Sequence, residues 1–105
     1  FVIHSSDYKI EKETLIIDSN YSVTGSNKII DDIENGLGPS CLFFSMGYSG
    51  WAPGQLEDEL MRDSWFVCPP TEKLVFHDDF DNKWKESLKI IGIDPSRLVL
   101  NGGTT

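Results

Sequence analysis

The chain has 105 residues and a formal net charge of −8, from 17 acidic and nine basic side chains. Thirty of its 105 residues are Leu, Ile, Val or Phe, above the roughly 20% below which chains stay disordered. This composition excludes intrinsic disorder and predicts one modest hydrophobic core, while the acidic charge opposes binding to phosphate backbones and anionic lipid.

The first half of the chain predicts strands and one helix. Apolar, β-branched runs bounded by turn residues predict strands over 1–4, 14–17 and 21–24, the last two as a hairpin. His4 lies in the first strand and is interpreted as a structural histidine rather than a metal ligand. Ser26 is a suitable N-cap for a helix that ends near Asn35. The nearly continuous apolar run 41–46 predicts a strand covered on both faces.

The second half predicts two helices with a strand between them. The helices are expected over 55–62 and 80–91, the strand over 65–68, a last helical turn after Asp94-Pro95 and a loose tail over 101–105. Trp65 and Trp84 are expected in the core. Because strands and helices alternate, we expect one α+β domain over residues 1–105, with about three helices packed on a mixed sheet.

Cysteine and histidine usage argues against a metal centre. Cys41 and Cys68 have no CxxC spacing, and His4 and His77 are the only histidines, so free thiols and no structural zinc are expected. The densest acidic cluster, beside His77, does not match the spacing of a calcium loop and is interpreted as the capped start of a helix. No apolar run approaches the 18 residues of a membrane span. We therefore expect an acidic cytoplasmic protein without cofactor, metal or membrane partner.

The loop before the second-half helix is the most unusual stretch. It joins a buried strand to a helix, a position where many α/β folds hold ligands. It does not match a phosphate loop, because no Lys follows, and Trp51 stands where a nucleophile elbow around Ser49 would need Gly. No catalytic residue is assigned. The candidate binding residues for a partner or ligand are Gly47, Tyr48, Gly50, Trp51, Pro53, Gly54 and Gln55. Trp51 either folds back onto the core or faces a partner.

Residues 47–60, GYSGWAPGQLEDEL, resemble the signature of the AlgH/YqgE family (DUF179) of bacterial proteins. Further segments that resemble family sequence lie at 1–5, 36–39, 63–65 and 80–98. The resemblance implies an α+β fold whose sheet curls towards a pseudo-barrel, with no cofactor and no assigned catalytic residue. It also implies that the chain is an N-terminally truncated, C-terminal part of a longer family sequence. One family member is associated with transcriptional regulation.

Three functions are consistent with these features. The first is a non-enzymatic protein-interaction or regulatory module that contacts another protein through the loop. The second is a small-molecule binder or enzyme that uses residues 47–55, with Gln55, Glu57 or His77 in its pocket. The third is direct DNA binding, which the net charge and the lack of a basic recognition helix oppose. The oligomeric state stays open.

Overall fold

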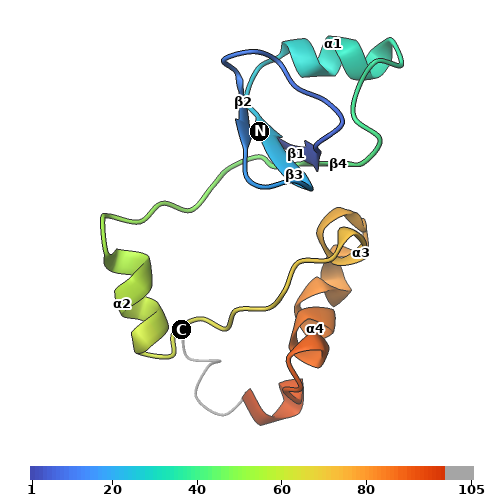
Figure 1. Ribbon diagram of the computed structural model, residues 1–105. Coiled ribbons are helices and arrows are strands. Elements are labelled where there is room, and N and C mark those ends of the chain that lie inside the picture. The colour runs from blue at the N-terminus through green and yellow to red at the C-terminus, as the bar shows by residue number, and fades with distance from the viewer. Residues whose placement is uncertain (99–105) are drawn as a thin grey trace. The chain divides into compact units, whose positions relative to one another are not determined.

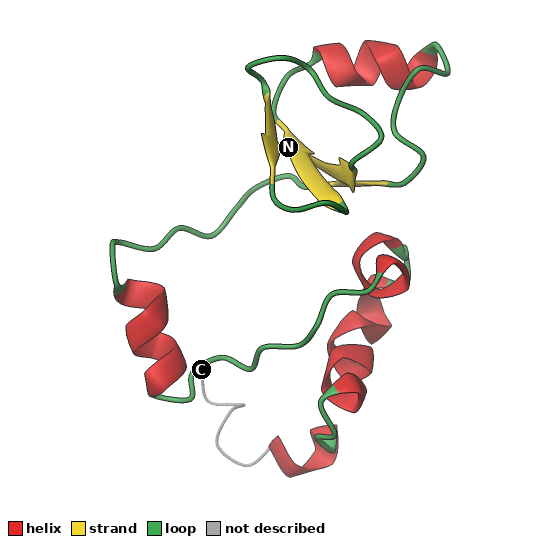
Figure 2. Ribbon diagram, viewed as in Figure 1, coloured by secondary structure: helices red, strands yellow, loops and turns green. Residues whose placement is uncertain are grey.

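The computed structural model describes residues 1–98 (Figure 1). Residue contacts divide the chain into two compact units, Phe1–Ser49 and Gly50–Thr105, named here the sheet unit and the helical unit. The predicted α+β class is confirmed, since the described strands all lie in the sheet unit and helices occur in both (Figure 2). The single domain over residues 1–105 stays a prediction, and the tail expected over 101–105 lies outside the described residues.

The sheet unit contains a four-stranded sheet in the order β2-β3-β1-β4, and one helix. The elements are β1 (Val2–Ser5), β2 (Thr14–Ile16), β3 (Tyr21–Thr24), α1 (Lys28–Glu34) and β4 (Leu42–Phe44). All lie within a few residues of their predicted positions. The N-cap of α1 is Asn27, one residue after the predicted Ser26, and its side chain makes no capping bond; the Ser26 hydroxyl accepts a hydrogen bond from the Lys28 amide at 3.2 Å.

The sheet differs from the expected mixed sheet, because every pairing among the described strands is antiparallel. The helix α1 connects β3 to β4, which run in the same direction on either side of β1. The insertion of β1 between them converts what would be a parallel contact into two antiparallel ones. β2 and β4 form the two edges, so the described sheet is open and is not closed into a barrel.

The core of the sheet unit combines apolar and polar side chains. Val2 and Ile29 are buried, and so are His4, Ser22 and Thr24. His4 Nε2 lies 2.7 Å from the Thr24 hydroxyl, and His4 Nδ1 lies 2.7 Å from the carbonyl oxygen of Ser5. Both ring nitrogens are therefore paired inside the protein, and the structural role predicted for His4 is confirmed.

The helical unit contains three α-helices and a 3₁₀ turn among its described residues. They are α2 (Gln55–Met61), α3 (Glu72–Phe76), α4 (Phe80–Ile90) and η1 (Pro95–Leu98). Four α-helices are thus described in the chain, against about three expected, because 72–76 forms a helical turn that Thr71 caps by accepting from the Leu74 amide.

The strand predicted over 65–68 is wrong, because no ladder partner pairs with this segment among the described residues. Its apolar residues fit a strand pattern, but a strand exists only through hydrogen bonds to a neighbour. The core placement predicted for Trp65 and Trp84 is also wrong, since they are 48% and 57% exposed. No helix within residues 1–98 is long and apolar enough to cross a membrane.

Candidate functional site

The boundary between the two units falls inside the predicted binding loop, after Ser49. Gly47 and Tyr48 therefore belong to the sheet unit, whereas the remaining predicted residues, Gly50, Trp51, Pro53, Gly54 and Gln55, belong to the helical unit. Within each unit, the structure brings members of the predicted loop together.

In the sheet unit, Tyr48 contacts the N-terminal residue. Its ring meets the ring of Phe1 edge-on, with 5.6 Å between centroids. Both residues, with Gly47, help to line an almost wholly apolar hollow of about 380 Å³. Tyr48 is 83% exposed, so this part of the loop offers apolar surface and few polar groups.

In the helical unit, Gly54 and Gln55 set the start of α2. Gly54 occupies the N-cap with a φ of 79°, a left-handed conformation that favours glycine. No side chain caps the helix start; the Gln55 Oε1 accepts a hydrogen bond from the Ala52 amide, in the loop before α2, at 2.9 Å. Gln55 thereby fixes the backbone beside Trp51 to the first turn of α2.

Glu59 is the centre of the polar contacts around Trp51. Its Oε2 accepts from Gln55 Nε2 at 2.9 Å, one helical turn earlier on the same face of α2. Its Oε1 accepts from the indole N–H of Trp65 at 2.7 Å and from that of Trp51 at 3.4 Å. The two indole rings meet edge-to-face, with centroids 5.9 Å apart. We call Trp51, Gln55, Glu59 and Trp65 the indole–carboxylate cluster.

The indole–carboxylate cluster is open to solvent and carries a stable negative charge. Trp51 and Trp65 are 38% and 48% exposed. Hydrogen bonds from Trp65 and then Gln55, with smaller effects of Trp51 and Arg62, lower the pKa of Glu59 below its ordinary value. The carboxylate is therefore ionised at neutral pH, and both tryptophans beside it are partly exposed.

The sequence interpretation identified Trp51 and Gln55 but missed Glu59 and Trp65. The sequence analysis gives Glu59 no binding role and places Trp65 in the core. One signal was available: Gln55 and Glu59 are four residues apart and so share a helix face. A second was that an indole N–H seeks an acceptor. The distance from Trp65 to Glu59 depends on the turn after α2, which the spacing alone does not fix.

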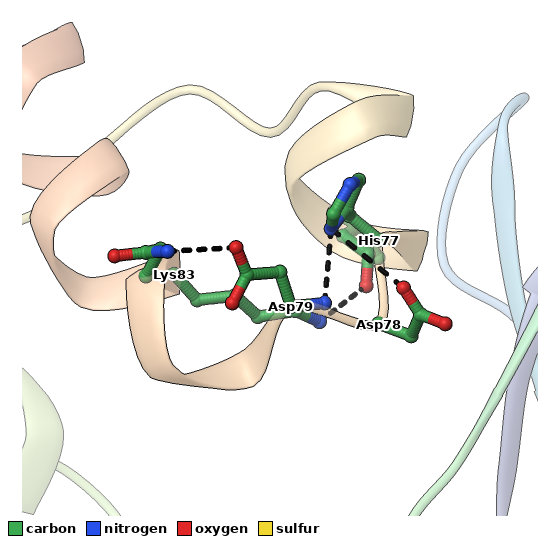
Figure 3. A network of polar contacts seen from close by, with 6 residues as sticks. His77, Asp78, Asp79 and Lys83 are labelled. Atoms are coloured by element: carbon green, nitrogen blue, oxygen red, sulfur yellow. Dashed lines mark hydrogen bonds and ion pairs between the residues drawn. The ribbon is translucent and has the colours of Figure 1, made fainter.

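His77 lies at a different place, at the end of α3, and Figure 3 shows its contacts. Its Nδ1 accepts a hydrogen bond from the Asp79 amide at 2.9 Å and lies 3.9 Å from the Asp78 carboxylate. Within residues 1–98, no hydrogen bond or ion pair joins His77 to Gln55 or Glu57. Gln55, Glu57 and His77 are alternatives for the predicted small-molecule pocket, and these contacts do not link His77 to either of the other two.

A cavity of about 270 Å³ lies beside His77, between α3 and α4. Lys83 lines it, and the ammonium group donates to the carbonyl oxygen of Val75 at 2.8 Å and lies 5.0 Å from the centre of the Phe80 ring. Burial lowers the pKa of Lys83. The acidic cluster lies at the start of α4, as predicted, but the predicted capping is wrong: the N-cap residue Asp79 makes no side-chain capping bond, and its carboxylate instead accepts a hydrogen bond from the Asn82 side chain at 2.7 Å.

The described residues contain no group of three or more His, Cys, Asp or Glu side chains arranged to hold a metal ion. Cys41 and Cys68 are free thiols, as predicted. Ser49 is exposed, and within residues 1–98 no hydrogen bond connects it to a histidine.

An open antiparallel sheet crossed by one helix, followed by an acidic helix with paired indoles, defines a small α+β protein with a solvent-exposed candidate binding site. The family model described as AlgH-like, DUF179, matches residues 1–96, and the chain belongs to this family. The resemblance found in the sequence is thus confirmed.

Several bacterial proteins are similar to nearly the whole chain. A UPF0301 protein of Bradyrhizobium diazoefficiens is 45% identical over 98% of this chain and 48% of its own length. One from Cereibacter sphaeroides is 39% identical over 98% of this chain and 56% of its own length. The solution structure of the AlgH protein from Pseudomonas aeruginosa matches with a TM-score of 0.72 and 29% identity, over 97% of this chain and 53% of that one. The chain spans about half the length of the relatives it matches.

Proposed function

We propose that the chain is a protein-interaction module without enzymatic activity of its own, and that the indole–carboxylate cluster is its contact surface. The observation that carries this proposal is the pair of exposed indoles, Trp51 and Trp65, whose N–H groups are both held by Glu59. Tryptophan is enriched among the residues that dominate binding energy at protein interfaces. Held side chains also lose little conformational entropy on binding.

The chemistry of the surroundings supports a protein partner over a nucleic acid. The net charge of −8 repels phosphate, and α2 adds the acidic residues Glu57 and Asp58 to Glu59. The free thiols of Cys41 and Cys68 accord with a reducing compartment, and we propose a cytoplasmic location on that ground. A regulatory role would act through the bound partner.

Affinity capture with matched tryptophan variants tests this function. The chain, Trp51→Ala and Trp84→Ala are immobilised and exposed to lysate from the source cells, and the captured proteins are identified by mass spectrometry. Trp84 is the control because it is 57% exposed but lies in α4, outside the cluster. Purified candidates are then titrated by calorimetry.

The expected result is a partner that binds the chain and Trp84→Ala equally and binds Trp51→Ala at least about thirtyfold more weakly, as for a hot-spot residue. Circular dichroism confirms that each variant is folded. Equal affinity of a purified partner for Trp51→Ala and for the unaltered chain would reject the cluster as the contact surface.

A second candidate function is small-molecule binding in the cavity between α3 and α4. The observation that favours it is the half-buried ammonium of Lys83 at the wall of a hollow of about 270 Å³. A thermal-shift screen of metabolites, repeated with Lys83→Met, tests it. A compound that stabilises the chain but not Lys83→Met would support this site, and no stabilising compound would count against it.

A further inference from the structure

In the indole–carboxylate cluster, most hydrogen-bond donors are already bound to Glu59, whereas part of the acceptor capacity of Glu59 is left over. The indole N–H groups of Trp51 and Trp65 and one amide hydrogen of Gln55 all point to the Glu59 carboxylate. What the cluster still offers to a ligand is therefore negative charge, a free carboxylate lone pair and the faces of two aromatic rings. An anionic ligand would meet an ionised carboxylate, whereas a cation would meet that carboxylate and two aromatic rings; among the groups that act on Glu59, the cationic Arg62 has the smallest effect.

The local charge points the same way. Residues 55–65 carry four acidic side chains and one basic side chain. That base, Arg62, is paired with Asp58 at 3.1 Å, and so does not neutralise Glu59 directly. The segment therefore presents a net charge of −3, the difference between its one base and four acids.

The ring geometry suits a cation. The two indoles are inclined at 70° with centroids 5.9 Å apart, so they form two sides of an open corner. Aromatic faces attract ammonium and guanidinium groups, most strongly at tryptophan. Glu59 holds both rings by their N–H groups, and Gln55 ties Glu59 to the loop backbone, so the corner exists before a ligand arrives.

We propose that the indole–carboxylate cluster binds the cationic side chain of a lysine or arginine on the partner protein. This inference rests on the proposed function and specifies the chemistry of the contact. An exposed ion pair contributes little alone, but here the carboxylate and both ring faces act on one charged group. Arginine gains in addition from stacking its planar group on an indole.

Titration of the 105-residue chain with small charged probes tests the inference. The probes are Nα-acetyl-lysine amide, Nα-acetyl-arginine amide, the uncharged Nα,Nε-diacetyl-lysine amide and tetramethylammonium. The readout is the indole N–H signals of the three tryptophans in proton–nitrogen NMR spectra. Glu59→Gln removes the charge while keeping the shape, and Glu57→Gln is the matched control in the same helix because Glu57 lies outside the cluster.

The lysine and arginine probes are expected to shift the signals of Trp51 and Trp65 but not that of Trp84, with weaker binding at higher salt. Affinity should fall up to about fivefold in Glu59→Gln and stay unchanged in Glu57→Gln. Equal shifts from the uncharged probe, or equal affinity in Glu59→Gln, would overturn the inference. Tighter binding of tetramethylammonium than of both amino-acid probes would assign the corner to a free quaternary ammonium ligand and overturn it as well.

The inference and the proposed function fail in different ways. If a purified partner depends on Trp51 but binds Glu59→Gln as well as the unaltered chain, the interaction surface stands and the cation inference fails. If the cationic probes bind at Glu59 while no partner depends on Trp51, the cation site stands and the protein-interaction function fails.

Discussion

The sheet unit and the helical unit treat their polar groups in opposite ways. In the sheet unit, His4, Ser22 and Thr24 are buried, and His4 and Thr24 are hydrogen-bonded to each other. In the helical unit, the polar contacts of Trp51 and Trp65 lie at the surface, and Leu88 is the one buried hydrophobic residue within its described part.

This difference separates residues that specify the fold from residues available for binding. A buried polar group is costly to leave unpaired, so the His4–Thr24 contact constrains the sheet. An exposed hydrogen bond exchanges with water at little cost, so Glu59 and the indoles are free to serve an interaction. We therefore expect substitutions of buried polar residues in the sheet unit to lower the free energy of unfolding strongly, and substitutions in the indole–carboxylate cluster to change it little.

Thr24→Val should give the largest effect. The Thr24 hydroxyl lies 2.7 Å from both His4 Nε2 and the Thr14 hydroxyl, so valine keeps the shape but removes the shared partner of both. We expect a loss of about 1–3 kcal/mol in the free energy of unfolding, measured by urea denaturation. Glu59→Ala should leave the midpoint nearly unchanged. Equal shifts in the two variants would remove the distinction between the units.

Gly54→Ala should give an intermediate effect. Gly54 has a φ of 79°, and a Cβ atom there would meet no other atom within 4 Å, so any cost comes from backbone strain alone. We expect a loss of about 1–2 kcal/mol. Gly50→Ala is the control, since its neighbourhood is equally open and its φ is not left-handed. The two variants should differ in thermal midpoint, and matching midpoints would show that α2 begins without this constraint.

Local patterns predicted the elements well. β3 occupies the predicted residues 21–24, and α2 begins at the predicted Gln55. The signals that predict them, which are turn residues, alternating hydrophobicity and glycines at the ends of elements, depend on a few neighbouring residues only. The β2–β3 hairpin was predicted, but the antiparallel pairing of β1 with β3 and β4 was not predictable in this way. It depends on β1 lying between β3 and β4, a long-range arrangement that no local pattern encodes.

The candidate site was predicted in part for the same reason. The unusual loop composition identified Trp51 and Gln55, and helical spacing relates Gln55 to Glu59. Trp65 joins them through the turn after α2, where Asp63 adopts a left-handed φ of 60°. The apolar run 65–68 instead suggested a buried strand, because hydrophobicity does not distinguish a core residue from an exposed aromatic contact.

The smallest expected effect is a pH dependence in the sheet unit. Tyr8 donates a hydrogen bond to the Asp32 carboxylate at 2.5 Å. Burial, and then this hydrogen bond and the charge of Asp32, raise the pKa of Tyr8 from 10.0 to about 12. Since the folded pKa lies above the unfolded one, the neutral phenol stabilises the fold fully below pH 10, and this contribution is lost as the pH rises towards 12.

Ultraviolet titration of the phenol groups measures this effect, with Asp32→Asn as the matched variant. Asparagine still accepts a hydrogen bond from Tyr8 but carries no charge, so the pKa of Tyr8 should move back towards 10.0. The loss of stability on raising the pH should again begin near pH 10, but it should be smaller and should end at a lower pH than in the unaltered chain. Superimposable titration curves for the two proteins would show that the charge of Asp32 does not raise the pKa of Tyr8. The Tyr8–Asp32 contact would then contribute less to the sheet unit than the His4–Thr24 contact does.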